Sequence, residues 1–312
     1  MRVAAIHQEA LDVRSFELRS TDARPLPAHE PGAHIDLRLP GGIERSYSLL
    51  DPETDGRSYR IAVQRDPRSR GGSSYLFENV TVGDHLDVAT PVNSFPLCQD
   101  AAPSVLIAGG IGITPIYSMV RRLEQQGRRW QLFYAARTRE RAAFLAELSM
   151  LEQAGSGRVT LFFDAERSGA QLDIAAIAAR CPSDAHLYCC GPVSMLAAFE
   201  TATARIPEER RHVEYFAAAN APAAGGFDVE LHRSGRVIRV PPGRSILDTL
   251  LESGMDLPRS CRSGVCGTCE TTVIAGIPDH RDQVLSARER ASNSKIMICC
   301  SGSLGEKLVL DL

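Results

Sequence analysis

Cysteines near the end of the chain constrain its fold more than any other feature of the sequence. Three of them lie in the segment RSCRSGVCGTCE, where Cys261, Cys266 and Cys269 follow the spacing C-x4-C-x2-C. Two more, Cys299 and Cys300, follow far downstream in KIMICCSG. If these thiolates converge on one metal centre, a tight loop must wrap one side of it and a later segment must close the other. The sequence therefore predicts a metal-binding loop whose last ligand comes from a distant part of the chain.

The spacing is that of a plant-type [2Fe-2S] cluster, in which cysteine thiolates hold two irons. Gly264 and Gly267 permit positive φ in the crowded loop and place backbone N–H groups near the sulfurs. A structural zinc site and a set of reduced, buried thiols are the two alternatives. Zinc modules usually pair two CxxC units, whereas only Cys266 and Cys269 form one in this loop. The motif therefore favours the iron–sulfur cluster.

The fourth cluster ligand is either Cys299 or Cys300. The spacing from Cys269 favours Cys299, and Cys300 is then expected to point to the opposite side of its strand. The predicted metal ligands are Cys261, Cys266, Cys269 and Cys299.

Length, charge and cysteine usage limit the classes of protein to which the chain can belong. At 312 residues it exceeds the size at which one core keeps growing, so two or three domains are expected. A net charge of -3 without blocks of like charge argues against nucleic acid and anionic membranes as partners. The first residues lack the apolar region of a signal peptide, and the longest apolar run, 105–117, is too short to span a bilayer. Nine cysteines, an odd number, argue against a secreted disulfide framework and predict a reducing cytoplasm.

Short alternating segments dominate residues 1–98 and are separated by turn signals such as Gly41-Gly42. This pattern predicts a small antiparallel barrel. Within it, the segment RSYS (45–48) stands at the start of an apolar strand. The segment RDPRSRGGSS (65–74) offers backbone and hydroxyl donors and positive charge to one phosphate. A solvated hairpin loop fits the composition of that segment equally well.

From residue 103 the pattern changes to strands that alternate with helices. The segment SVLIAGGIGITPIYSMVRRLEQQG (104–127) predicts a buried strand, a glycine turn and an amphipathic helix. The turn GGIGITP lets the backbone approach a pyrophosphate, and Pro115 is expected as a first helical residue. Because Pro115 replaces the last glycine of G-x-G-x-x-G, a plain strand-to-helix turn is the alternative.

Three further strands, WQLFYAAR, RVTLFFDAE and HLYCCGP, alternate with helical segments. This order implies a parallel sheet with ligands at the carboxyl ends of its strands. Cys190, Gly191 and Pro192 lie at one such end, where Gly191 permits close approach and Pro192 starts a helix. The alternative role for Cys190 is that of a small buried hydrophobe.

A stretch of small residues, 217–226, reads as a linker to the last part of the chain. The segment FDVELHRSGRVIRV predicts a hairpin that turns at Ser234-Gly235, and residues 245–253 predict a helix capped at Gly254. With the final strand LVLDL, the pattern is that of a sheet grasping one helix beside the metal loop.

Together these segments resemble the phthalate dioxygenase reductase family, which includes the reductase components of vanillate-type O-demethylases. The resemblance covers essentially the whole chain and respects the order of its parts. It implies an antiparallel β-barrel flavin domain (1–100), an α/β nicotinamide-binding domain with a parallel sheet (101–220) and an α+β β-grasp [2Fe-2S] ferredoxin domain (226–312).

Motif by motif, the resemblance implies sites for FMN and NADH. RSYS matches the family's flavin signature, RGGS (70–73) its flavin phosphate loop, GGIGITP its nucleotide loop, and YCCGP (188–192) the segment beside the nicotinamide. Phe216 corresponds to the aromatic residue at the flavin. The implied cofactor-binding residues are Arg45, Tyr47, Ser48, Ala62, Val63, Gln64, Arg70, Gly71, Gly72, Ser73, Gly109, Gly110, Gly112, Thr114, Cys190, Gly191, Pro192 and Phe216.

The resemblance also implies an activity, in which electrons pass from NADH through FMN and the [2Fe-2S] cluster to a Rieske-type terminal oxygenase. The implied catalytic residues are Ser48 near the flavin, Cys190 beside the nicotinamide, and Phe216, which covers the nicotinamide face and must move aside for NADH. The alternatives are an FAD reductase that uses NADPH, a passive electron-carrier ferredoxin on an inert scaffold, and a zinc-dependent binding module.

Two positions depart from the family pattern. The family tends to have an arginine where this chain has Gly302, which is expected to alter docking to the electron acceptor. At the end of the second α/β strand the chain has Arg137, Arg139 and Arg141, where an acid would favour a free ribose hydroxyl. NADH is nevertheless the expected donor.

Overall fold

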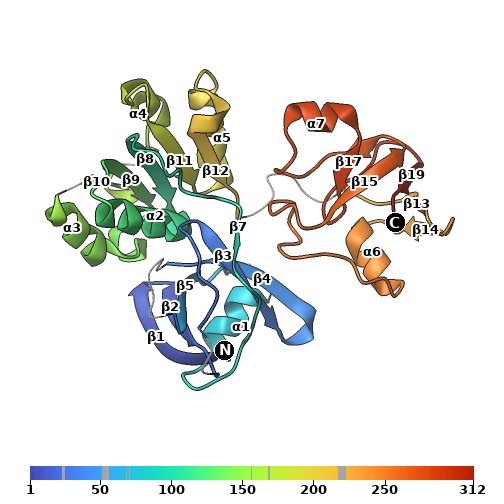
Figure 1. The fold of residues 1–312 in the computed structure, drawn as a ribbon, viewed down its shortest axis with the longest axis horizontal. Coiled ribbons are helices and arrows are strands. Elements are labelled where there is room, and N and C mark those ends of the chain that lie inside the picture. The colour runs from blue at the N-terminus through green and yellow to red at the C-terminus, as the bar shows by residue number, and fades with distance from the viewer. Residues whose placement is uncertain are drawn as a thin grey trace. The chain divides into compact units, whose positions relative to one another are not determined.

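The computed structural model describes residues 1–22, 25–50, 56–67, 69, 71–155, 157–167, 169–216 and 223–312. The chain divides into two compact units, Met1–Glu214 and Tyr215–Leu312 (Figure 1). The first unit holds both the predicted barrel and the predicted parallel sheet, and the second holds the cysteine loop. Within the described part of the chain, no helix is long and apolar enough to cross a bilayer.

The first part of unit 1 is an antiparallel β-barrel, as the alternating segments predicted. An isolated bridge from Leu49 to Ile61 joins its two sheets. Phe16, Leu18 and Ile35 are fully buried between them. One sheet has the order β1 (Arg2–Ala10), β2 (Val13–Arg19), β5 (Ser58–Gln64), and the other has β4 (Ile43–Ser48), β3 (Ala33–Leu39), β6 (Asp87–Val88), with β7 (Val92–Asn93) also paired to β3.

The predicted phosphate segment is not a loop throughout, because α1 (Gly72–Glu78) begins within it. Gly71 precedes this helix with a φ of 93°, a value that disfavours a side chain. The glycine pair therefore serves as a helix start, where the first backbone N–H groups have no partner within the helix.

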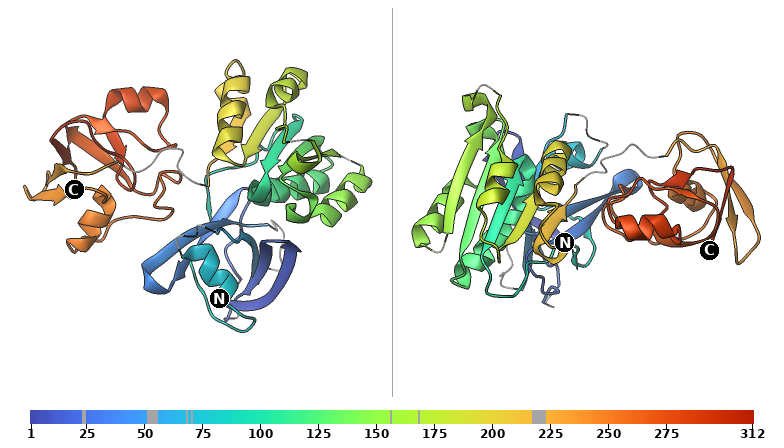
Figure 2. Two further views of the ribbon diagram at one scale, coloured as in Figure 1. Left: turned by 180° about the vertical axis from the view of Figure 1, so that it is seen from behind. Right: turned by 90° about the horizontal axis from the view of Figure 1, so that it is seen from above.

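The second part of unit 1 is a parallel sheet with helices on both faces (Figure 2). Helices α2 and α3 pack together, as do α4 and α5, and right-handed crossovers place the two pairs on opposite faces. The strand order reverses between β8 and β11, so a ligand crevice is expected at their carboxyl ends. The sheet order is β10 (Gly157–Phe163), β9 (Trp130–Ala136), β8 (Ser104–Gly109), β11 (His186–Cys190), β12 (Arg211–Glu214), and the helices are α2 (Ile113–Gln125), α3 (Leu145–Ala154), α4 (Ile174–Arg180) and α5 (Val193–Thr203).

Helix boundaries differ from the sequence prediction by a few residues. Pro115 is the third residue of α2 rather than the first, and Pro192 precedes α5 as its N-cap. The segment before α3 breaks at Phe144, whose φ is 63°, so RERAAF does not join the helix. The described 3-10 turns are η1 (Pro40–Gly42), η2 (Gly110–Gly112), η3 (Arg139–Arg141), η4 (Asp164–Arg167) and η5 (Glu208–Arg210).

The barrel and the parallel sheet share one hydrophobic core. Leu50 and Ala62 from the barrel pack in the same cluster as Ile113 and Tyr117 of α2. At the rim, the Leu11 N–H donates to the Glu140 carbonyl at 2.8 Å. This shared core explains why the two predicted domains form one compact unit.

Unit 2 is a β-grasp fold, as predicted. Strand β13 pairs in parallel with β19, while the hairpin β13–β14 turns at Ser234 and Gly235. Ser245 caps α6 by accepting a hydrogen bond from the Asp248 N–H. The five-stranded sheet has the order β14 (Val237–Val240), β13 (Phe227–Leu231), β19 (Lys307–Leu310), β15 (Glu270–Ala275), β17 (Lys295–Met297), beside the pair β16 (Pro278–Asp279) and β18 (Gly302–Ser303) and the helices α6 (Ile246–Glu252) and α7 (Ala287–Ser292).

Candidate functional site

Four cysteines of unit 2 converge through the pairing of β15 with β17. Cys261, Cys266 and Cys269 lie in the loop that runs from α6 to β15, and Cys299 lies in the turn after β17. Hydrogen bonds join the Cys261 and Cys266 thiols and the Cys269 and Cys299 thiols. The four thiols therefore form two touching pairs. Two neighbouring thiol pairs are the donor set that a plant-type [2Fe-2S] cluster requires, because two thiolates hold each of its irons.

The backbone of the cysteine loop adopts the conformation that its glycines predicted. Gly264 has a φ of 71° and Gly267 a φ of 78°. The Ser263 N–H donates to the Cys261 sulfur at 3.4 Å. The hydrogen bond from the Cys261 thiol lowers the pKa of Cys266 to about 5, which favours the thiolate, the form that binds metals.

The sequence predicted that Cys300 points to the opposite side of its strand from Cys299. The structure differs. Cys299 and Cys300 both lie in the turn after β17, so the alternation of strand side chains does not apply to them. Hydrogen bonds with Cys269 and then with Cys300 raise the pKa of the Cys299 thiol. A Cβ on Gly264 would lie 2.4 Å from the Cys300 sulfur, so this thiol packs against the metal loop. The contact between Cys269 and Cys299 still supports Cys299 as the fourth ligand.

Asp282 anchors the cysteine loop, although no sequence pattern marks it. Its side chain is fully buried, and Oδ2 accepts hydrogen bonds from the backbone N–H groups of Val284 (3.1 Å) and Leu285 (2.8 Å). The adjacent Gln283 N–H donates to the Gly264 carbonyl at 2.8 Å. The buried Asp282 side chain thus organises the turn 282–285, and this turn is hydrogen-bonded to the cysteine loop.

Gly302, one of the two departures, is buried rather than displayed on the surface. A Cβ there would lie 2.4 Å from the Ala223 Cβ and 3.2 Å from the Phe227 ring. An arginine at this position would have to displace both residues. Glycine at position 302 therefore fits the tight packing around it in this chain.

In the barrel, the residues expected to hold a phosphate lie together. A Cβ on Gly72 would lie 2.5 Å from the Arg45 Cγ, so the Arg45 side chain crosses the first residue of α1. The Ser73 hydroxyl accepts a hydrogen bond from the Asp66 N–H at 3.2 Å. Arg70 lies outside the described residues. The arrangement gathers one guanidinium, one hydroxyl and the backbone N–H groups at the start of α1, which is a donor set suited to a phosphate.

Ser48 and Tyr47 end strand β4 beside this group. The Ser48 Oγ is buried and has no hydrogen-bond partner within the described residues, which is costly unless a ligand supplies one. Burial raises the pKa of Tyr47 to about 12, so its hydroxyl stays protonated. An orphaned buried hydroxyl at this position fits a bound flavin.

Ala62, Val63 and Gln64 alternate along β5. Val63 packs in the barrel core, whereas Ala62 packs in the core shared with the parallel sheet. The Gln64 Nε2 donates to the Asp12 Oδ2 at 3.4 Å. Since their side chains are engaged in these contacts, any cofactor contact of Ala62 and Val63 would use the backbone.

The nucleotide loop and the end of β11 touch each other at the level of the backbone. A Cβ on Gly109 would lie 2.6 Å from the Pro192 Cδ, and one on Gly112 would lie 2.3 Å from the Cys190 carbonyl oxygen. At Gly110, by contrast, a Cβ would meet no described atom within 4 Å, and φ is 54°. The glycines thus combine close packing with an open backbone surface, as a pyrophosphate site needs.

Two neighbours complete the contact between these loops. A Cβ on Gly191 would lie 3.1 Å from the Gly109 backbone nitrogen. Thr114 is 2% exposed, and its hydroxyl donates to the Ile111 carbonyl at 3.0 Å. The loops after β8 and β11 therefore form a single rigid edge.

Glu214 is a candidate site residue that the sequence analysis missed. It pairs with Cys190 across β11 and β12, and its Oε2 is buried with no partner within the described residues. Burial raises the pKa of Glu214 from 4.5 to about 8. Burial also raises the pKa of the Cys190 thiol, which is 0% exposed, so both groups are neutral at pH 7. A carboxylic acid next to a thiol at the end of a strand can donate a hydrogen bond to a ligand there.

We expect Glu214→Gln to make the protein relatively more stable as the pH rises. The folded carboxyl binds a proton up to about pH 8, whereas the unfolded one loses it near pH 4.5. The wild-type protein therefore loses folding free energy as the pH rises from about 4.5 to about 8. The variant does not, because glutamine has no titratable proton. The free energies of unfolding of both proteins at pH 6 and pH 9 should show the variant gaining about 3 kcal/mol relative to wild type between the two pH values. An equal difference at the two pH values would contradict the burial of an ionisable Glu214.

Phe216 and the arginines that follow β9 are the remaining residues that the sequence singled out. Phe216 follows β12, and its side chain is 42% exposed. The Arg139 guanidinium lies 4.6 Å from the Phe163 ring centroid and 3.8 Å from the Glu166 carboxylate. Arg141 forms an ion pair with Asp12 of the barrel. Two of the three arginines at the end of β9 are therefore engaged within the protein.

Two domain families match the chain. The oxidoreductase NAD-binding domain matches residues 106–201, and the 2Fe-2S iron-sulfur cluster binding domain matches residues 229–302. The second match covers the four converging cysteines, and the first covers the glycine loop and the end of β11.

Curated relatives match over the full length. Phenoxybenzoate dioxygenase subunit beta of Ectopseudomonas oleovorans is 52% identical, and tetrachlorobenzoquinone reductase of Sphingobium chlorophenolicum is 47% identical. Each comparison covers 100% of this chain and 97% of the relative. A solved structure of phthalate dioxygenase reductase, described as modular for electron transfer from pyridine nucleotides to [2Fe-2S], is 37% identical. Its TM-score is 0.79, and the match covers 100% of this chain and 97% of that one.

Proposed function

Because the chain belongs to the phthalate dioxygenase reductase family, we propose that it carries electrons from NADH, with FMN and a [2Fe-2S] cluster, to a Rieske-type terminal oxygenase acting on an aromatic ring. The chain is an oxidoreductase with an NAD-binding domain and a [2Fe-2S] domain. The observation that carries the proposal is the convergence of four thiols in a β-grasp unit that follows the barrel and the NAD-binding sheet in one polypeptide. The oxygenase names of the relatives support an oxygenase as the acceptor.

The barrel residues would hold FMN. Arg45, Ser73 and the backbone at Gly71 and Gly72 would bind its phosphate, and Arg70 would add charge. The Ser48 hydroxyl, which lacks a partner among the described groups, would donate to the ring system. When bound, FMN converts the electron pair of a hydride into the single electrons that a [2Fe-2S] cluster accepts.

The edge of the parallel sheet would position NADH. The open backbone at Gly110 would accept the pyrophosphate, and Cys190 with Gly191 would bound the nicotinamide. The neutral Cys190 thiol and the protonated Glu214 keep negative charge away from this position. Phe216 would shield the reacting face from water and oxygen until NADH displaces it. In this proposal the described residues would orient the donor and exclude solvent.

The engaged arginines support NADH over NADPH. A 2′-phosphate is usually held by a free arginine near the end of the second strand. Arg139 and Arg141 already contact Glu166 and Asp12, so a 2′-phosphate would compete with these carboxylates for the two guanidinium groups.

An anaerobic titration tests the proposed function and the donor preference. Purified holoprotein is expected to release FMN on denaturation, to be reduced stoichiometrically by NADH, and to reduce a Rieske-type oxygenase added at substoichiometric amounts. NADPH should reduce it at least about tenfold more slowly at equal concentration. Release of FAD, or reduction by NADPH as fast as by NADH, would contradict the assignment.

A second candidate function is direct two-electron reduction of a quinone. It is favoured by the 47% identity to tetrachlorobenzoquinone reductase over the full length of both chains. It predicts NADH oxidation with a chlorinated benzoquinone in the absence of any oxygenase. Because a quinone can react with the flavin directly, this activity should survive removal of the cluster, whereas electron delivery to an oxygenase should not.

A further inference from the structure

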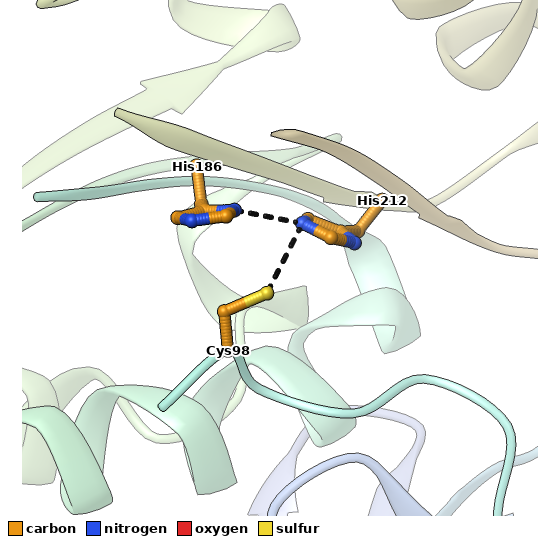
Figure 3. A group of neighbouring side chains, drawn as sticks. All are labelled: Cys98, His186 and His212. Atoms are coloured by element: carbon orange, nitrogen blue, oxygen red, sulfur yellow. Dashed lines mark hydrogen bonds between the residues drawn. The ribbon is translucent and has the colours of Figure 1, made fainter. Parts of the chain in front are cut away.

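We propose that Cys98, His186 and His212 form a binding site for a transition-metal ion of the Zn²⁺ class, separate from the iron–sulfur cluster. The three side chains come from the connector after the barrel and from the amino ends of β11 and β12 (Figure 3). One ligand atom from each lies within 4.8 Å of the others. The proposal does not depend on the proposed electron-transfer function.

Two of the distances between the ligand atoms match the edges of a tetrahedral site, and the third is within 4.8 Å. The His186 Nδ1 lies 3.1 Å from the His212 Nε2, and the Cys98 Sγ lies 3.6 Å from the same nitrogen. Tetrahedral Zn²⁺ with ordinary bond lengths separates two nitrogens by about 3.3 Å and a nitrogen from a sulfur by about 3.6 Å. As Figure 3 shows, the His186 Nδ1 and the Cys98 Sγ both lie next to the His212 Nε2, so the three ligand atoms form one group.

The surroundings orient the ligands in the way that metal sites require. The second nitrogen of His186, Nε2, lies 2.7 Å from the Asp100 Oδ2. A carboxylate at this position fixes the ring and leaves Nδ1 free to bind a metal. The Tyr188 ring stacks on His212 with centroids 4.4 Å apart, and its hydroxyl accepts the Cys98 N–H at 2.9 Å. Both the imidazole and the cysteine backbone are thereby held in place.

The position of the site indicates what an ion would do there. His186 begins β11, whose other end is Cys190, so the two ends of the strand lie about 13 Å apart. An ion at this end would not contact the nucleotide edge. It would instead pin the connector that holds Cys98 to the two strands that end at Cys190 and Glu214. With three protein ligands, water would complete the coordination.

Zinc titration of the holoprotein tests the site. The protein is first treated with a mild chelator, and its iron content is checked, so that the cluster cysteines stay occupied. We expect one Zn²⁺ to bind per chain, and Cys98→Ser and His212→Gln each to weaken binding at least tenfold. Asp100→Asn should weaken it about tenfold through the orientation of His186. Cys181→Ser, which alters another partly buried thiol of the same unit, is the matched control and should bind Zn²⁺ as wild type does.

A second measurement needs no variant. Zn²⁺ should protect Cys98 from iodoacetamide in the wild-type protein, as read by peptide mass spectrometry, and should leave alkylation of Cys181 unchanged. The proposal is overturned if Zn²⁺ does not bind, if Cys98→Ser and His212→Gln bind it as tightly as wild type, or if Cys98 is alkylated equally fast with and without Zn²⁺. Any of these outcomes would mean that Asp100, His186 and His212 form only a hydrogen-bonded chain and not a metal site.

Discussion

Cys299→Ser is expected to abolish the [2Fe-2S] cluster, whereas Cys300→Ser is expected to retain it. Of the two adjacent thiols, Cys299 makes the hydrogen bond to Cys269 that closes the set of four. A serine hydroxyl is a poor substitute for thiolate on iron, so the variant should lose most of its iron. Iron analysis and the electron paramagnetic resonance signal of the dithionite-reduced protein measure the result.

Cys300 is a demanding control because it lies so close to the centre. Its sulfur packs against Gly264, and its thiol contacts that of Cys299. Full iron content in Cys299→Ser together with loss in Cys300→Ser would reverse the assignment. Flavin content should be normal in both variants, because the barrel residues proposed to hold the flavin lie in unit 1, which has its own core.

The fold was largely predictable from the sequence because its strongest patterns are local. Period-two alternation marked the barrel, and strand–helix alternation marked the parallel sheet. On α2, Ile116, Met119, Val120 and Leu123 were expected on one face, and all four are fully buried. The prediction failed where the backbone conformation overrode these patterns, as at Phe144, whose left-handed conformation delays the start of α3 to Leu145.

The candidate site was predictable only where a motif carries it. Glycine loops and the cysteine spacing stand out in a sequence, since both have fixed separations. Glu214 and Asp282 do not, because their roles come from burial and from contacts across the sheet or between loops. Cys98, His186 and His212 are likewise brought together by the register of three separate segments. No fixed sequence spacing relates a residue of the connector to residues at the ends of two strands, so this group could not be predicted from the sequence.

Cys190→Ala is expected to slow reduction of the flavin by NADH about 100-fold while leaving flavin and iron content unchanged. The residue closes the edge at which β11 meets the nucleotide loop, with its carbonyl against Gly112. Burial raises the pKa of its thiol, so we expect it to act by its shape and weak polarity, which position the nicotinamide, rather than as a thiolate. Stopped-flow measurement under anaerobic conditions reports the rate directly.

The neighbouring cysteine supplies the matched control for this prediction. Cys189 is also 0% exposed but points to the opposite side of β11, so Cys189→Ala removes the same atom without touching the nicotinamide position. Its flavin should be reduced at close to the wild-type rate, and Cys190→Ser should recover part of the lost rate. Because the thiol stays neutral, the deficit of Cys190→Ala should be the same at pH 6 and pH 8. Equal rates in the two alanine variants would contradict the placement of the nicotinamide at the end of β11. A deficit that grows with pH would indicate that Cys190 acts as a thiolate.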